Sequence, residues 1–190
     1  MKTSHKRWMS VAALLLIGVY FVPIWSISME APQYPEGIGM NVTVDNIEGK
    51  SPQDLKNING LNHYIGMKPI EPASIPELSI MPYIFGFFII SGLIIAATGS
   101  RKLILFWLAL FVLLAIAGLV DFYLWGYDYG HNLNPDAPIK VPGMTYQPPL
   151  IGSKQLLNIN ATSLPHIGFY FALVSMGIAG WVWWKSKEEK

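Results

Sequence analysis

Residues 78–125 have the sequence LSIMPYIFGFFIISGLIIAATGSRKLILFWLALFVLLAIAGLVDFYLW, which is two apolar runs joined by a short polar segment. Each run is at least as long as the roughly 20 residues that a helix needs to cross a membrane. Pro82 lies near the start of the first run, where a missing backbone donor is tolerated. Because so short a connection makes two helices antiparallel neighbours, the stretch predicts spans at 78–98 and 103–125 with a turn at 99–102.

Two further apolar runs flank this hairpin and bring the predicted number of spans to four. Residues 8–27 form the first run, and the spacing of Ser26 and Ser28 leaves a signal-peptidase cleavage beside them open. The run is longer than the roughly 7–15 apolar residues of a signal peptide, which favours an uncleaved first helix. Residues 164–184 form the last span and lead into a charged tail at 185–190.

The composition supports an integral membrane protein. Of 190 residues, 52% are hydrophobic and only 13% are charged, whereas a soluble domain has roughly 25% charged residues. The charges lie almost entirely between the apolar runs. A chain with this distribution is expected to contact the lipid bilayer over most of its helical surface.

Two long hydrophilic segments separate the predicted spans, at 28–77 and 126–163. The first contains six prolines and the second five, which disfavours long regular helices there. Alternation within 40–47 predicts one short strand, and Ser51 is a suitable N-cap for a short helix. The predicted fold is an all-α membrane protein with four transmembrane helices, in which these two loops form a small, mostly irregular cap.

The distribution of basic residues predicts the orientation in the membrane. Residues 1–7, the turn at 99–102 and the tail at 185–190 together contain eight Lys or Arg and two Glu. The two long hydrophilic segments with Asp121 contain five Lys and ten acidic residues. Since the positive side faces the cytoplasm, we expect both termini to be cytoplasmic and both long loops extracytoplasmic.

The chain contains no cysteine, which limits the possible chemistry. Structural disulfides, iron–sulfur clusters and covalently attached haem are excluded. A haem held by two histidines is disfavoured because no predicted span has a histidine at mid-depth. No nucleotide-binding motif is present, and the acidic character of the exposed loops disfavours nucleic acid as a partner.

The stretch NINGLNHYIGM at 57–67 is the strongest candidate for a site. His63 and Met67 would share a face if this stretch is helical. Met40 and Met144 each follow a glycine in the predicted cap, as Met67 does. Thioether and imidazole ligands suit Cu(I), so we expect these four residues to bind Cu(I). The alternative is that the methionines fill gaps in packing.

Four further polar residues are weaker candidates. His166 lies in a partial repeat of the stretch above and would be at the outer mouth of the fourth span, where a water can satisfy it. Asp121 is close to the bilayer, where a carboxylate usually has a partner or a function. Asp128 and His131 would share its face if the helix continues. An acid–base enzyme using Asp121 and His131 lacks a recognisable constellation, so a non-enzymatic role is favoured.

NINGLNHYIGM at 57–67 and PGMTYQPPLIGSKQLLNINAT at 142–162, on a four-span scaffold, resemble small membrane proteins associated with nitrous oxide reductase gene clusters of the Sec-exported type. The resemblance covers most of the chain and assigns no residue roles. It implies an accessory protein of copper-dependent respiration and denitrification, located in the inner membrane of a bacterium, that binds or passes Cu(I) for an exported redox enzyme. The alternative is a metal-free structural subunit or docking platform for an exported redox enzyme or a membrane respiratory complex.

Overall fold

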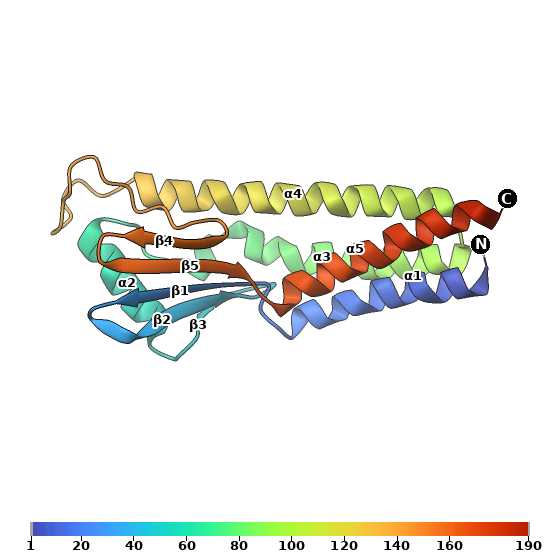
Figure 1. Ribbon diagram of the computed structural model, residues 1–190, viewed down its shortest axis with the longest axis horizontal. Helices are drawn as coiled ribbons and strands as arrows, with labels where there is room; N and C mark the ends of the chain where they lie inside the picture. Colours follow the sequence, from blue (N-terminus) through green and yellow to red (C-terminus); the bar gives the residue numbers. More distant parts are fainter. Residues whose placement is uncertain (1, 190) are drawn as a thin grey trace.

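The computed structural model describes residues 2–189 and shows an elongated molecule with two distinct ends (Figure 1). One end is a bundle of helices that also holds both termini. The bundle contains α1 (Thr3–Leu15), α3 (Pro76–Thr98), α4 (Arg101–His131) and α5 (Ile167–Lys185). The other end, which we call the cap, contains a β-sheet and α2 (Asp54–Ile65). Short 3₁₀ helices within the described residues are η1 (Leu16–Tyr20), η2 (Pro72–Ser74) and η3 (Ser186–Glu189).

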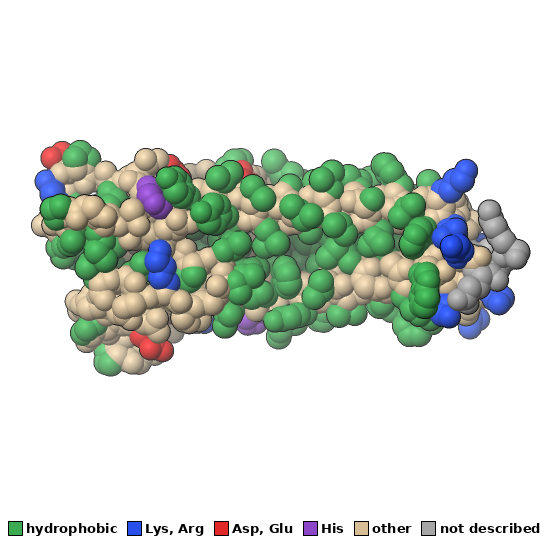
Figure 2. Space-filling model, turned by 45° about the horizontal axis from the view of Figure 1, so that its top comes forward, with side chains coloured by type: hydrophobic (Ala, Val, Ile, Leu, Met, Phe, Trp, Pro, Cys, Tyr) green, Lys and Arg blue, Asp and Glu red, His purple; other side chains and the backbone are tan. Residues whose placement is uncertain are grey.

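In the described part of the chain, three helices are long and apolar enough to cross a membrane: α3, α4 and α5. Hydrophobic side chains cover much of the helical surface, and Lys and Arg side chains gather at the end near the termini (Figure 2). α4 has 31 residues, so it is about 46 Å long at the usual helical rise. This length exceeds a hydrocarbon core of about 30 Å, and the far end of α4 packs in the cap.

The cap is built on a five-stranded antiparallel sheet with the order β3-β2-β1-β5-β4. The strands are β1 (Trp25–Ala31), β2 (Tyr34–Val42), β3 (Ile47–Gly49), β4 (Gly152–Leu156) and β5 (Ile159–Pro165). Ile27 at the centre lies opposite Met40 on one side and Ser163 on the other. The sheet therefore joins the segment after α1 to the segment before α5.

One face of the sheet forms the core of the cap. Trp25 and Ile27 on β1 are buried there with Met40 of β2 and Ile58 of α2. The indole Nε1 of Trp25 donates a hydrogen bond to the Ser163 hydroxyl over 2.7 Å, which links β1 to β5. Since neighbouring side chains on a strand alternate between faces, the intervening serines of β1 lie on the opposite face.

The predicted all-α fold with four spans and an irregular cap is wrong. The predicted first span, 8–27, is helical only as far as Tyr20, and β1 begins at Trp25. Pro23 fixes its φ and cannot donate a backbone hydrogen bond, which helps to end the helical run. From Trp25 onward, large apolar side chains alternate with small polar ones, the period of a strand rather than a helix.

The second predicted loop also differs from the structure. α4 continues to His131, and 159–165 is strand β5, so α5 begins only at Ile167. The strand predicted at 40–47 spans the end of β2, a turn and the start of β3. The helix predicted to follow Ser51 begins at Asp54.

A buried carboxylate attaches α2 to the sheet. Asp54 is buried in the first turn of α2, and its Oδ2 accepts a hydrogen bond from the backbone N–H of Gly39 in β2 over 2.9 Å. The carboxylate therefore satisfies a donor of the sheet and also lies at a favourable position for the helix dipole.

Replacing Asp54 with alanine is expected to lower the free energy of unfolding by about 2 kcal/mol, since hydrogen bonds to charged groups contribute about 1.5–3 kcal/mol. Denaturant titration in detergent micelles measures the loss. Asp45→Ala is the matched control, because the carboxylate of Asp45 is exposed and accepts a hydrogen bond from Thr43; it should change stability by less than about 0.5 kcal/mol. Equal losses in the two variants would contradict the role of the Asp54–Gly39 contact.

Candidate functional site

A cavity of about 430 Å³ opens in the cap. Its walls come from the inner face of the sheet, α2, the end of α4, the segment 132–151 and the β4–β5 connection. Ile27, Ile58 and Ala161 are buried in its floor, whereas Tyr64 and Leu157 are exposed at its mouth. The β4–β5 connection lies at the end of the molecule that faces away from the helical bundle (Figure 1).

Three methionines from separate elements line this cavity: Met29 on β1, Met40 on β2 and Met67 directly after α2. Met29 and Met40 belong to the same face of the sheet, because Met40 pairs with Ile27, two residues before Met29. Among the described residues, none that lines the cavity carries a charged side chain. The wall therefore offers neutral, soft sulfur atoms in an apolar setting.

An aromatic wall faces the cavity from α4 and the segment that follows it. The rings of Trp125 and Tyr129 pack together with their centroids 4.2 Å apart. The Tyr129 hydroxyl donates a hydrogen bond to the carbonyl of Pro69 over 3.1 Å. Tyr146 is only 3% exposed, and its hydroxyl has no hydrogen-bond partner in the described part of the chain. This hydroxyl is therefore an unsatisfied polar group that is enclosed behind the wall and does not face the cavity.

The polar residues of the stretch 57–67 serve mainly to fix the chain. The side-chain amide of Asn59 both accepts from the N–H of Ile70 (2.7 Å) and donates to its carbonyl (3.1 Å). Asn62 donates to the carbonyl of Lys68 over 3.3 Å. Gly66 ends α2 with φ of +80°, a conformation that glycine adopts without steric cost. These contacts hold Met67 at the cavity.

The structure brings together only part of the predicted copper set. Met40 and Met67 line the cavity, whereas His63 and Met144 do not. His63 is exposed, and its ring contacts the neighbouring Tyr64 edge to face with centroids 6.0 Å apart. Met29 also lines the cavity, although the predicted set does not include it. Its place in the alternating pattern that starts at Trp25 puts it on the same face as Ile27.

The acidic candidates and His131 lie outside the cavity. Asp121 is exposed on α4. The carboxylate of Asp128 forms an ion pair with Lys68 at 2.7 Å, which joins α4 to the segment after α2. The Nδ1 of His131 is 2.9 Å from the carbonyl of Tyr127, and the two rings are stacked. These contacts favour structural roles for Asp128 and His131.

His166 lies at the junction between β5 and α5. It occupies the N-cap position of α5, and its backbone N–H donates to the carbonyl of Ile24 over 2.9 Å. Its ring Nδ1 is buried and has no hydrogen-bond partner among the described residues. Since His166 does not line the cavity, it is not part of the candidate site.

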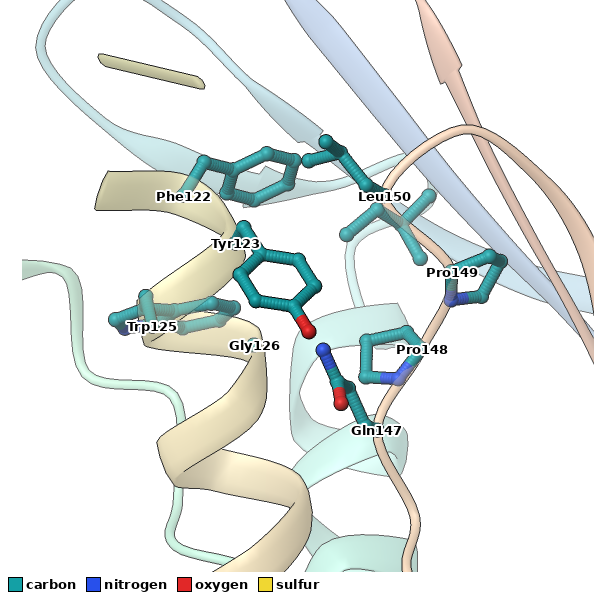
Figure 3. A pocket seen from close by; sticks show the side chains of 9 residues that line it. Phe122, Tyr123, Trp125, Gly126, Gln147, Pro148, Pro149 and Leu150 are labelled. Carbon is teal, nitrogen blue, oxygen red and sulfur yellow. The ribbon is translucent and has the colours of Figure 1, made fainter. Parts of the chain in front are cut away.

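A second pocket lies between α4 and residues 147–150 and measures only about 10 Å³ (Figure 3). The hydroxyl of Tyr123 points toward the side-chain amide of Gln147 across it. This volume is at most the room that one water molecule needs. The cap cavity is therefore the better candidate for a ligand site.

Neither a cluster of common metal-binding side chains nor a related protein identifies the site. Within residues 2–189 there is no cluster of three or more His, Asp or Glu side chains that would hold a metal ion. No protein-family model matches the chain, and no curated protein matches its sequence. The chemistry of the site rests on the thioethers, the aromatic rings and the apolar walls of the cavity.

Proposed function

We propose that the protein is an accessory membrane protein of copper-dependent respiration whose cap binds Cu(I) and passes it to an exported redox enzyme. The observation that carries this proposal is that Met29, Met40 and Met67 line one cavity in a chain without cysteine. Thioether sulfur is a soft ligand that selects Cu(I) over Zn²⁺ and other harder divalent cations. The proposal replaces His63 and Met144 of the predicted set with Met29.

The proposed setting is the inner membrane of a bacterium, with the cap on the extracytoplasmic side. Lys and Arg gather at the end of the bundle that holds the termini (Figure 2), and the positive side of such a bundle faces the cytoplasm. The cavity mouth then faces away from the membrane. A soluble, exported partner would reach the methionines from that side.

Competition titration tests the copper proposal. The protein is placed in lipid nanodiscs, loaded with Cu(I) under anaerobic conditions and titrated with a chromogenic chelator. The Met40→Leu/Met67→Leu variant should bind Cu(I) about tenfold more weakly or worse, whereas leucine preserves most of the packing volume. His63→Ala/Met144→Leu is the control and should keep the wild-type affinity. If the two double variants bind Cu(I) equally, the cavity is not the copper site.

A metal-free docking platform is the second candidate, and the rim of the cavity favours it. Tyr64, Ile139 and Leu157 are 55%, 47% and 39% exposed around the mouth, and exposed apolar groups around a cavity are typical of interaction sites. This function predicts that an exported redox enzyme co-purifies with the protein in the presence of a strong copper chelator. Release of the enzyme by the chelator would contradict it.

A further inference from the structure

One edge of the cap sheet, strand β4, is open to another chain. β4 pairs only with β5, whereas the three central strands of the sheet pair on both sides. The side chains of Ser153, Lys154 and Gln155 in the middle of β4 are exposed. The opposite edge, β3, has only three residues and lies against the start of α2, because a Cβ added at Gly49 would be 3.0 Å from the backbone nitrogen of Leu55. The free edge of the sheet is therefore β4.

The register of the β4–β5 hairpin shows which backbone groups of β4 face outward. A two-residue turn joins Leu156 to Ile159, and the pair that closes such a turn is hydrogen-bonded. Because hydrogen-bonded and non-hydrogen-bonded pairs alternate along an antiparallel ladder, Ser153 and Gln155 belong to non-hydrogen-bonded pairs. The 2.8 Å contact between the hydroxyls of Ser153 and Thr162 agrees, since side chains are closer in such pairs. The N–H and C=O groups of Ser153 and Gln155 therefore point away from β5.

These four outward backbone groups are unpaired at the free edge. Within residues 2–189, no other backbone group bonds to the outward N–H or C=O of Ser153 or Gln155. A row of alternating donors and acceptors is a template for an additional strand. An extended peptide segment offers the complementary donors and acceptors at the same spacing.

The lysine of β4 leaves this edge open and adds a charge beside it. Lysine on an edge strand usually hinders the addition of another strand. Lys154, however, pairs with Ala161, which is buried on the inner face of the sheet, and its Nζ donates to the carbonyl of Gln147 over 3.1 Å. Among the described residues, no carboxylate forms an ion pair with Lys154. A carboxylate directly opposite it on an added strand would be favourable.

Apolar side chains flank the free edge at both ends. Ile151 directly precedes β4 and is 58% exposed, and Leu157 directly follows β4 and is 39% exposed. An added strand would remove part of both side chains from water, which favours binding. The edge therefore suits a segment with apolar residues on either side of a carboxylate.

The direction of β4 disfavours a second copy of this chain as the added strand. The strands run along the long axis of the molecule, as the helices do (Figure 1), so they are roughly perpendicular to a membrane that the bundle crosses. Two copies with the same orientation in one membrane would bring their β4 strands together in parallel, unlike every pair in this sheet. Parallel pairing is also the less stable kind. A segment that approaches the cap from outside the membrane has no such restriction.

We propose that the free edge of β4 binds an extended segment of an exported protein, which adds antiparallel to β4 as a sixth strand. The backbone of this segment pairs with the outward groups of Ser153 and Gln155, and a carboxylate of the segment faces Lys154. The inference rests on the docking function proposed above, and it names the surface and the kind of segment through which docking occurs.

The probe is a fluorescein-labelled peptide of the sequence Thr-Val-Thr-Glu-Thr-Val-Thr with blocked termini. In antiparallel register its Glu faces Lys154 when its two Val residues lie opposite Gly152 and Leu156. Fluorescence anisotropy measures binding to metal-free protein in lipid nanodiscs, and empty nanodiscs correct for adsorption to lipid. The wild type should bind the peptide saturably. The same peptide with N-methyl groups on its third and fifth residues lacks the donors that face β4 and should bind at least tenfold more weakly.

Variants of β4 test the edge itself. Gln155→Pro removes one outward N–H but no bond of the β4–β5 ladder, and proline is tolerated at such edge positions. It should weaken binding of the peptide about three- to tenfold, the effect of losing one hydrogen bond, at an unchanged unfolding temperature. Gln155→Thr keeps the N–H and is the matched control, which should bind as the wild type does.

A charge exchange tests the pairing with Lys154. Lys154→Glu should weaken binding of the Glu peptide about two- to fivefold, the range of cross-strand ion pairs. The same variant should bind more tightly than the wild type to a peptide in which Lys replaces the Glu. Unchanged preferences in Lys154→Glu would contradict the carboxylate as part of the recognised segment.

The outcomes separate the edge from the docking function as a whole. Absence of saturable binding by the wild type, or equal affinities of Gln155→Pro and Gln155→Thr, would overturn the proposal for β4. If an exported redox enzyme nevertheless co-purifies, the docking function stands and uses another surface. Peptide binding at β4 without a co-purifying enzyme would support the edge as a peptide site and remove the redox enzyme as its partner.

Discussion

Gly130→Ala is expected to lower the free energy of unfolding by about 3 kcal/mol, at the upper end of the usual cost of overpacking. Gly130 lies near the end of α4, and a Cβ added there would clash with the backbone nitrogen and the Cα of Gln147. Backbone atoms cannot rotate out of the way as a side chain can. The carbonyl of Gly130 also accepts a hydrogen bond from the N–H of Tyr146. The variant therefore pushes apart the end of α4 and the segment around Tyr146, which are held together by this hydrogen bond.

Gly126→Ala, one helical turn earlier, is the matched control. The closest atom to a Cβ added there is Cγ of Pro148, at 4.0 Å, which is an ordinary van der Waals contact. Alanine is also about 1 kcal/mol better than glycine inside a helix, so this variant should keep or slightly raise stability. Denaturant titration followed by tryptophan fluorescence in detergent micelles measures both. Similar losses in the two variants would show that the contact with Gln147 is not the cause.

The long apolar helices are the part of the fold that the sequence predicts well. The runs at 78–98 and 103–125 lie within α3 and α4, which are long and apolar enough to cross a membrane. Length and apolar character are properties of a segment alone. No knowledge of distant contacts is needed to recognise such helices.

The sheet is harder to predict because it depends on contacts between distant segments. Trp25, Ile27 and Met29 alternate with polar residues, but they directly follow an apolar run, so by composition alone Trp25 and Ile27 resemble its end. β5 has the sequence INATSLP, which contains few of the β-branched and aromatic residues that favour strands. It becomes a strand by pairing with β1, which lies near the other end of the sequence.

The same limit applies to the candidate site. Residue type alone indicates Met40 and Met67 as soft ligands, and both line the cavity. Ile58, Leu61, Asn62 and Ile65 of α2 also line it, in the spacing of one helical face. His63 lies a further 100° or so beyond Asn62, in the direction away from Ile58, Leu61 and Ile65, so it is on the opposite side of α2 and does not line the cavity. The rotation of a helix about its own axis, which decides the face that it turns toward its neighbours, depends on tertiary contacts and cannot be read from residue type.

Trp107→Ala is expected to reduce the free energy of unfolding by about 3 kcal/mol or more, the usual cost of truncating a buried aromatic residue. Trp107 on α4 is 2% exposed, and its ring packs against Phe88 of α3 and Phe111 of α4, each with centroids 5.3 Å away. Its Nε1 also donates a hydrogen bond to the carbonyl of Phe88 over 3.1 Å. Within a bilayer, helices associate mainly through such packing and through interhelical hydrogen bonds, so the variant weakens the contact between α3 and α4.

Phe106→Ala provides the matched control, since Phe106 is the preceding residue of the same helix and is 66% exposed. Removing a ring that is exposed on the outside of the bundle leaves no cavity between helices, so the loss should stay below about 0.5 kcal/mol. Both variants are compared in the same micelles, with the loss of helical circular dichroism as the second signal. If Phe106→Ala costs as much as Trp107→Ala, then α3 and α4 are not held together by the packing of Trp107 and its two aromatic neighbours. A large loss confined to Trp107→Ala would instead identify this aromatic cluster as the main attachment between the two helices that carry the cap.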